Sequence, residues 1–119
     1  MIEKTSVIQN LGTMLDVLSL NQRLISQNIA HIHTSGYVPL RLDFAETMEN
    51  IQQGQERNNG QGIDFVLRPQ LDQWGSPAKI ELDTEMAALS ENTVQFQTLL
   101  KAINRQYTIL SMAVNDGKK

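Results

Sequence analysis

Two histidines, His31 and His33, are the side chains in this sequence best suited to bind a metal ion or to exchange a proton near neutral pH. Their spacing of two residues points them to different sides of a helix, so one helix cannot offer both to the same ion. No cluster of carboxylates adjoins them in the sequence, and a zinc site needs three or four protein ligands. We therefore interpret the histidines as the polar end of a helix, where they hydrogen-bond its last carbonyl groups.

A second candidate for chemistry is the carboxylate pair Asp83 and Glu85, which has the composition of an acid–base pair. No nucleophile, oxyanion motif or third partner accompanies these residues, whereas both suit the start of a helix, with Asp83 as its N-cap. The glycines of the Gly60-Gln61-Gly62 stretch lack the spacing of a phosphate-binding loop. The sequence therefore predicts no catalytic, cofactor-binding or metal-binding residue, and we expect no enzyme activity.

The single tryptophan, Trp74, leaves two interpretations open. It is either an anchor in a protein–protein interface or a side chain that packs over the turn at Pro77.

Composition narrows the class of protein further. The 119 residues carry a net charge of −3, which gives no basic surface for nucleic acid, and they contain no cysteine for disulfides or thiolate metal sites. No apolar run reaches the roughly 20 residues of a membrane span, so we expect no direct membrane insertion. The N-terminus, from Met1 to Thr5, lacks the basic and apolar regions of a secretory signal, and no cleaved signal peptide is predicted.

The elements that position these residues are two long helices near the ends of the chain. The first is predicted from about Ser6, in a capping box with Gln9, to His33, and Gly36 then stops it in a left-handed conformation before Pro39. Apolar residues recur in alternating steps of three and four, with Gln22 as one polar position, and form a predicted assembly seam: Ile8, Leu11, Leu15, Leu18, Ile25, Ile29 and Ile32.

The second long helix is predicted from the Asp83 cap to a break at Asn115-Asp116-Gly117. It repeats the three–four alternation, with Thr93 as its polar position. Its predicted assembly seam contains Met86, Leu89, Phe96, Leu100, Ile103, Tyr107, Leu110 and Val114.

The segment between the helices has a different pattern of apolar and polar residues. Leu40, Leu42 and Phe44 alternate with charged residues, which predicts a short extended piece, and a short helix is expected over 44–53. Residues 52–62 contain no apolar side chain and are predicted to form a mobile loop. Short strands are expected over 63–67 and 78–82, on either side of a turn at 74–77.

We therefore predict a mainly α-helical fold. Residues 1–36 and 83–119 form a coiled-coil assembly domain, and residues 37–82 form a loop-rich, partly extended insert. Both helices carry further apolar residues off their seams, such as Val17, Leu20 and Leu24, and their other faces hold few charges. Such faces suit helices packed among other helices, which favours a subunit of a larger assembly. A soluble coiled-coil adaptor or regulator is the alternative.

Two motifs stand at the inner ends of the predicted helices: residues 28–37, which are followed by Asp43-Phe44, and residues 82–86. They resemble the signatures of bacterial flagellar axial proteins, the family of the rod, hook and filament junction, and most closely its proximal rod members. The first motif precedes an Asp-Phe pair, and the second leads into the C-terminal heptads. The chain departs from the family pattern at His31, usually a second Asn, and at Ser35, commonly Pro. The matching residues are Asn28, Ile29, Ala30, Thr34, Gly36, Tyr37, Asp43, Phe44, Asp83, Glu85 and Met86.

This resemblance implies a structural subunit of the flagellar basal-body rod, either in the proximal rod or in another rod position. It implies that the flagellar type III apparatus exports the chain without a cleaved signal. The implied partners are copies of the chain, other rod proteins, the adaptor that joins the rod to the membrane ring, and the export apparatus. The implied location is the periplasmic rod, an axial tube that transmits torque and surrounds the export channel.

Overall fold

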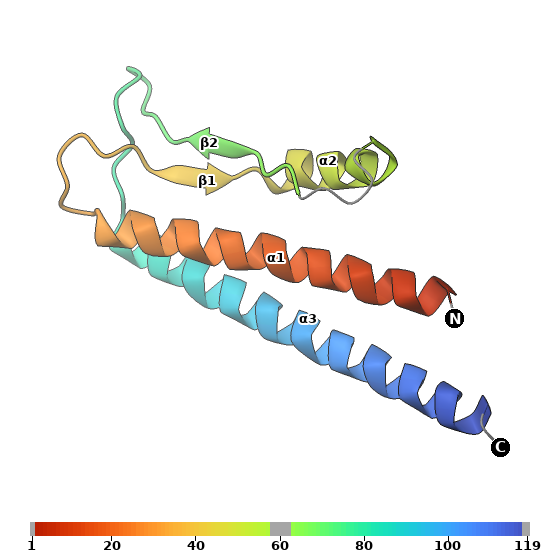
Figure 1. Ribbon diagram of the computed structural model, residues 1–119. Coiled ribbons are helices and arrows are strands. Elements are labelled where there is room, and N and C mark those ends of the chain that lie inside the picture. Colours follow the sequence, from red (N-terminus) through yellow and green to blue (C-terminus); the bar gives the residue numbers. More distant parts are fainter. Residues whose placement is uncertain (1, 58–62, 118–119) are drawn as a thin grey trace.

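The computed structural model describes residues 2–57 and 63–117. It contains the helix α1 (Ile2–Ala30), the strand β1 (Leu40–Leu42), the helix α2 (Phe44–Arg57), the strand β2 (Leu67–Pro69) and the helix α3 (Leu82–Gly117). The two long helices pack side by side in opposite directions, and the middle segment lies along the other side of α1 (Figure 1). The predicted fold, two long terminal helices with a short strand and loop insert, is confirmed.

The boundaries of α1 differ from the prediction at both ends. The helix already includes Ser6, so this residue is not its N-cap; no proline or glycine lies before it to stop the helix. At the other end α1 stops at Ala30, because the following amides bond to carbonyls only three residues back, Ile32 to Ile29 and Thr34 to His31. Gly36 has the expected left-handed conformation, with φ of 79°, but it lies beyond these turns.

The helix α3 is longer than predicted. The Glu85 amide donates to the Glu81 carbonyl oxygen at 3.0 Å, which places the cap at Glu81 and puts Asp83 inside the first turn. The helix includes Asn115 and Asp116 and extends to Gly117, the last residue of the predicted break. At 1.5 Å per residue its 36 residues span about 54 Å, most of the 66 Å length of the molecule.

The two short strands form an antiparallel pair in which Leu40 lies opposite Pro69 and Leu42 opposite Leu67. The strands predicted over 63–67 and 78–82 are therefore wrong. The position of β2 is set by its pairing with β1 and not by the local sequence pattern. The helix predicted over 44–53 is confirmed but runs on to Arg57, so the predicted loop is wrong for residues 52–57; the rest of that prediction, residues 58–62, lies outside the described part.

The expected turn at 74–77 is present and is held by one carboxylate. Asp72 Oδ1 accepts hydrogen bonds from the amides of Trp74 and Ser76, both at 2.9 Å, and Gly75 has a φ of 80°. Trp74 is 79% exposed at the tip, so the interpretation that it packs over the turn is wrong for this structure.

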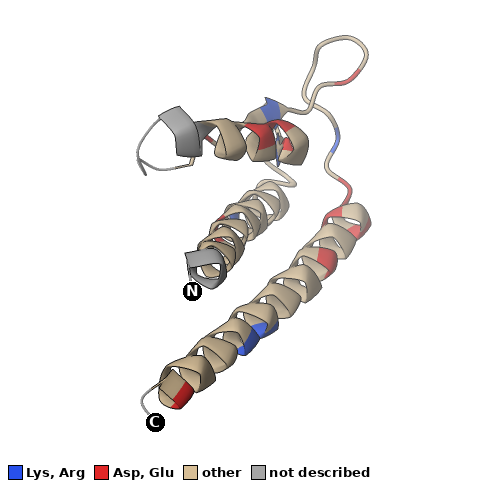
Figure 2. Ribbon diagram, turned by 90° about the vertical axis from the view of Figure 1, so that its right-hand side faces the viewer, with Lys and Arg blue, Asp and Glu red and all other residues tan. Residues whose placement is uncertain are grey.

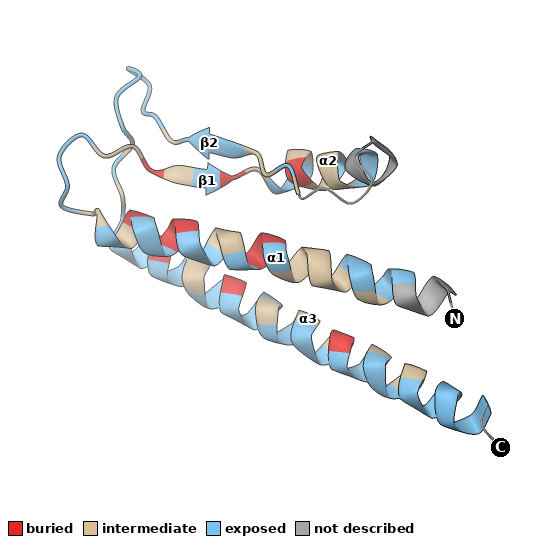
Figure 3. Cartoon of the chain, in the orientation of Figure 1, coloured by how far each residue is buried: buried red, intermediate tan, exposed pale blue. Residues whose placement is uncertain are grey.

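The hydrophobic core lies between α1 and the middle segment. It centres on Val17, Leu24 and Leu42, with five partly buried residues around them: Leu20, Leu40, Met48, Ile51 and Phe65. The second apolar stripe of α1 is therefore covered by the same chain, so the prediction that it packs against neighbouring subunits is wrong. Figure 3 shows that buried positions gather along α1 and β1, whereas the second half of α3 is mostly exposed.

Candidate functional site: the junction of the two motifs

The first motif centres on the side-chain amide of Asn28, which is almost fully buried near the end of α1. Its nitrogen donates to the Leu40 carbonyl oxygen at 3.1 Å. Its oxygen accepts hydrogen bonds from the Tyr37 hydroxyl at 3.2 Å and, more weakly, from the Leu40 amide at 3.4 Å. The amide therefore joins α1, the turn after it and β1, and a buried polar group with these partners is fully compatible with the interior.

The histidine departure from the family pattern has a local explanation. The rings of His31 and Tyr37 stack with centroids 4.3 Å apart and an angle of 7° between their planes. The Nδ1 atom of His31 lies 2.8 Å from the Gln27 carbonyl oxygen, so the Nδ1–H tautomer donates to the end of α1 as predicted. His33 is exposed. Among residues 2–57 and 63–117, no group of three or more metal-binding side chains gathers.

Other members of the first motif are less buried. Ile29 is half-buried, Ala30 and Thr34 are exposed, and Gly36 supplies the left-handed turn before Tyr37. Ser35, the second departure from the family pattern, is exposed, and nothing in the structure explains it.

The Asp-Phe pair of the motif starts α2. Asp43 Oδ1 accepts a hydrogen bond from the Glu46 amide at 3.1 Å, which makes Asp43 the N-cap of this helix. The Glu46 amide and the guanidinium group of Arg68, which also binds the Glu46 carboxylate, hold the pKa of the Asp43 carboxyl below its ordinary value. The Asp43 amide donates to the Val66 carbonyl oxygen at 2.8 Å, so the cap is continuous with the β1–β2 ladder.

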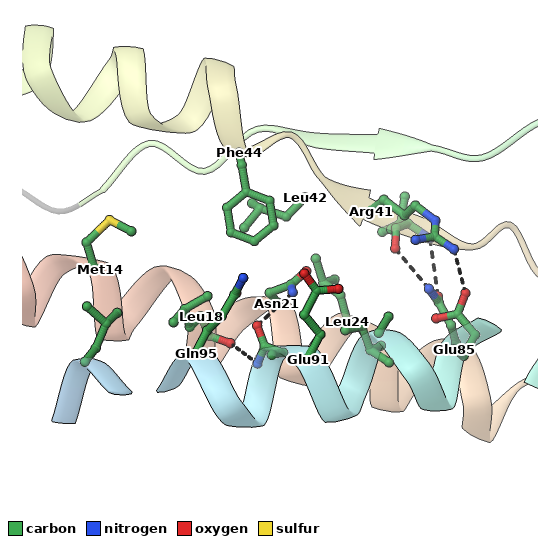
Figure 4. A pocket seen from close by; sticks show the side chains of 16 residues that line it. Met14, Leu18, Asn21, Leu24, Arg41, Leu42, Phe44, Glu85, Glu91 and Gln95 are labelled. Carbon is green, nitrogen blue, oxygen red and sulfur yellow. Dashed lines mark hydrogen bonds and ion pairs between the residues drawn. The ribbon is translucent and has the colours of Figure 1, made fainter. Parts of the chain in front are cut away.

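The second motif meets the first through an ion pair. Glu85 at the start of α3 is 3% exposed, and its Oε1 atom lies 2.9 Å from the Nη2 atom of Arg41 in β1 (Figure 4). The Oε2 atom of Glu85 is buried without a hydrogen-bond partner. The residue predicted to favour the helix dipole thus holds β1 against α3. Sequence reasoning missed Arg41, because its partner is 44 residues away.

A buried asparagine links the two long helices. The Asn92 side chain donates to the Leu18 carbonyl oxygen at 2.9 Å and accepts from the Asn21 side chain at 2.9 Å. Sequence reasoning missed Asn92 and assigned the polar position to its neighbour Thr93, which is exposed. The signal available in the sequence was the seven-residue spacing of Glu85, Asn92 and Leu99, which places these three residues in one column along the helix.

The structure divides the predicted seam of α3 into two columns. Leu89, Phe96, Ile103 and Leu110 are buried or half-buried, whereas the members one residue after the polar column are exposed: Met86, Leu100, Tyr107 and Val114. The predicted seam residues of the first helix are all buried or half-buried, with the last of them just beyond the end of α1: Ile8, Leu11, Leu15, Leu18, Ile25, Ile29 and Ile32. Their role in contacts between subunits stays a prediction.

The junction encloses a cavity of about 600 Å³ between α1, α3 and the start of α2 (Figure 4). Leu18, Leu24, Leu42 and Phe44 give it an apolar wall, and Glu85, Glu91 and Gln95 line it from α3. The cavity reaches the surface at Phe44, Glu91 and Gln95, all of which are exposed.

No protein-family model matches this sequence. The chain is, however, 23% identical to the flagellar basal body rod protein FlgB of Bacillus subtilis (strain 168), in an alignment of 125 positions that covers 96% of this chain and 97% of that protein. The resemblance to flagellar rod proteins is confirmed. The similarity to FlgB runs from end to end, so it includes both motifs of the junction.

In the described part of the present chain, residues 2–57 and 63–117, no helix is long and apolar enough to span a membrane.

We predict that Asn28→Ala lowers the free energy of unfolding by about 1–3 kcal/mol, because it leaves the peptide groups of Leu40 without their partner inside the protein. The matched control is Gln27→Ala, which removes an exposed amide from the same helical turn and should change stability by less than about 0.5 kcal/mol. Urea unfolding followed by circular dichroism measures both. Equal effects of the two substitutions would show that Asn28 does not hold the junction.

The lowered pKa of Asp43 predicts a pH dependence of stability. A carboxyl group whose pKa is lower in the folded state stabilises the fold above its unfolded pKa, near 3.8, and this contribution is lost as the pH falls through the folded pKa. Asp43→Asn keeps a capping oxygen but removes the charge. We expect the wild-type protein to exceed this variant in stability at neutral pH and the difference to vanish in acid. A difference that stays constant below pH 4 would contradict the assigned cause.

Proposed function

We propose that this chain is a structural, non-enzymatic subunit of the bacterial flagellar basal-body rod, in the proximal rod position of FlgB. The observation that carries the proposal is the end-to-end similarity to a FlgB protein. The pair of long helices makes the subunit elongated, and the exposed faces of these helices suit contacts with further helices.

The surface that we assign to these contacts is the exposed column of α3. Met86, Leu100, Tyr107 and Val114 stand at multiples of seven residues, and their exposed fractions range from 38% to 55%. Large apolar side chains at heptad spacing on a free helix face mark a site where another helix packs. We infer that this column joins neighbouring subunits in an inner helical layer around the export channel.

The rest of the functional assignment follows from the rod position. The partners are copies of the chain, other rod proteins, and the adaptor that joins the rod to the membrane ring. The flagellar export apparatus delivers the chain without signal cleavage, and the assembled rod transmits torque. No cofactor takes part in this function.

Gene replacement in the source organism tests the proposal. We expect deletion to leave cells without a rod or hook, and wild-type protein to restore both. Leu100→Asp should fail to restore them, although the purified variant keeps its helix content and unfolding midpoint, because Leu100 is 43% exposed in the free chain. The control Gln97→Asp adds the same charge at an exposed position off the column and should restore motility.

A companion substitution separates assembly from folding. Ile25→Asp places a charge at a position that is only 5% exposed, so it should destabilise the free chain by several kcal/mol, an order of magnitude typical of unpaired buried charges. Normal motility of the deletion strain would overturn the rod assignment and favour the soluble adaptor. Full assembly of Leu100→Asp would overturn only the assigned surface.

A further inference from the structure

The segment between β2 and α3 folds back on itself in a well-ordered tip, residues 70–78. The Asp72 amide donates to the Ser76 carbonyl oxygen at 2.8 Å, and the Ala78 amide donates to the Gln70 carbonyl oxygen at 2.9 Å. The Asp72 carboxylate holds the turn from inside, as described above. Figures 1 and 2 show that this segment projects away from the pair of long helices. The tip is therefore a rigid projection and not a loose loop.

Two large apolar side chains stand exposed on this tip. Trp74 is 79% exposed and Leu71 is 50% exposed. Tryptophan is among the residues most enriched at the centres of protein interfaces, and a tip that is already ordered loses little conformational entropy on binding. The indole ring also carries one N–H donor, which needs an acceptor where the ring becomes buried. The tip thus calls for an apolar hollow that contains a hydrogen-bond acceptor.

The cavity between α1, α3 and the start of α2 has both properties. Its volume of about 600 Å³ is large enough to admit one aromatic side chain, and Leu18, Leu42 and Phe44 belong to its apolar wall. Glu85 lines it beside Arg41 (Figure 4), and the buried Oε2 atom of Glu85 has no hydrogen-bond partner among the described residues. A buried carboxylate oxygen without a donor is costly. The occupant that suits this cavity is an apolar group with a hydrogen-bond donor.

The charges around the tip and the cavity are also complementary. Lys79 follows the tip and is exposed, and Glu91 is exposed at the mouth of the cavity. Neither takes part in an ion pair within residues 2–57 and 63–117. The carboxylate of Asp72, the other charge of the tip, is engaged by two backbone amides. A tip that enters the cavity therefore brings a free cation toward a free carboxylate.

We propose that the tip of one copy docks into the cavity of a second copy of this chain. The Trp74 ring packs against the apolar wall, its N–H donates to Oε2 of Glu85, and Lys79 approaches Glu91. The tip does not fill the cavity of its own chain, since Trp74 is 79% exposed there. The contact joins two different patches, so each copy offers a cavity to one neighbour and a tip to another.

This inference rests on the proposed rod function and adds to it a contact made by the middle segment. The cavity is separate from the exposed heptad column, because Met86, Leu100 and Tyr107 are not among the residues that line it. The two surfaces can therefore be altered independently.

Disulfide cross-linking tests the docking, because the natural chain has no cysteine. Ser76→Cys on the tip and Gln95→Cys at the mouth of the cavity are placed together in one chain, and both positions are exposed. Oxidation of flagellated cells whose own copy is replaced should give a ladder of dimers and higher species on a denaturing gel. A disulfide within one chain would give only the monomer, so the gel separates the two cases.

The matched control is Ser76→Cys with Gln97→Cys, which moves one cysteine by two residues to an exposed position off the cavity and should give no ladder. Ala88 lines the cavity, whereas its neighbour Ala87 is exposed and does not. Adding Ala88→Phe to the first cysteine pair fills the cavity and should abolish the ladder, whereas adding Ala87→Phe should leave it unchanged. An unchanged ladder with Ala88→Phe would overturn the assignment to the cavity.

A second measurement needs no cysteine. Trp74→Ala should abolish rod assembly and motility while the purified variant keeps its unfolding midpoint, because the side chain is 79% exposed in the free chain. The control Gln73→Ala changes the neighbouring exposed residue and should preserve motility. Motile cells that carry Trp74→Ala would overturn the docking, whether or not the cysteine variants assemble.

The hydrogen bond to Glu85 has a test of its own. Trp74→Phe keeps an aromatic ring but removes the N–H donor, so adding it to the first cysteine pair should weaken the ladder several-fold. An unaltered ladder would overturn this bond.

Three further results would overturn the docking of a second copy while leaving the rod function in place. One is the absence of the ladder in motile cells. Another is a dimer formed by Ser76→Cys alone, which indicates that two tips meet in a symmetric contact. The third is a cross-link of Ser76→Cys to a different rod protein. Failure of the rod function itself is read separately, from the deletion strain.

Discussion

The side-chain amide of Asn28 is the contact on which the rest of the chain depends. It bonds to both the carbonyl and the amide of Leu40, as the peptide group of a neighbouring strand would, and it also accepts from Tyr37. These bonds turn the chain back along α1 and fix the position of β1. With β1 in this position, Arg41 pairs with Glu85 and Leu42 packs in the core. A buried amide tolerates few alternatives, since each lost partner costs about 1–3 kcal/mol.

A buried asparagine stands in the contact between the long helices, and the free surface of α3 carries a column of apolar side chains. Glu85 and Asn92 face inward with specific partners, whereas Met86, Leu100 and Tyr107 face outward. Buried polar side chains of this kind fix the register of two helices at some cost in stability. The chain thus has one defined internal pairing and leaves its heptad column exposed, which is what we expect of the proposed rod subunit. This division of labour suits a protein that completes its packing by assembly.

Much of the architecture was predictable because local signals agree with it. The long helices, the extended piece at Leu40, the left-handed Gly36 and the helix after Asp43 all follow from periodicity and turn chemistry. The phase of α3 was not predictable in this way. Periodicity selects the more apolar column, which contains Met86, Leu100 and Tyr107. The contact with α1 uses instead the column one residue earlier, because its member Asn92 bonds to the Leu18 carbonyl group 74 residues away. The strand β2 was misplaced for the same reason, since its position depends on β1.

A reconstruction of purified flagellar basal bodies from the source organism, at a resolution that traces side chains, tests the rod assignment most directly. We expect this chain in the proximal rod, with α1 and α3 in the inner helical layer, the middle segment outside them, and Asn28 bonded to Leu40. The absence of the chain from the purified basal bodies would contradict the assignment. A rod subunit with its terminal helices separated, or with the middle segment detached from α1, would contradict the structural account of the junction.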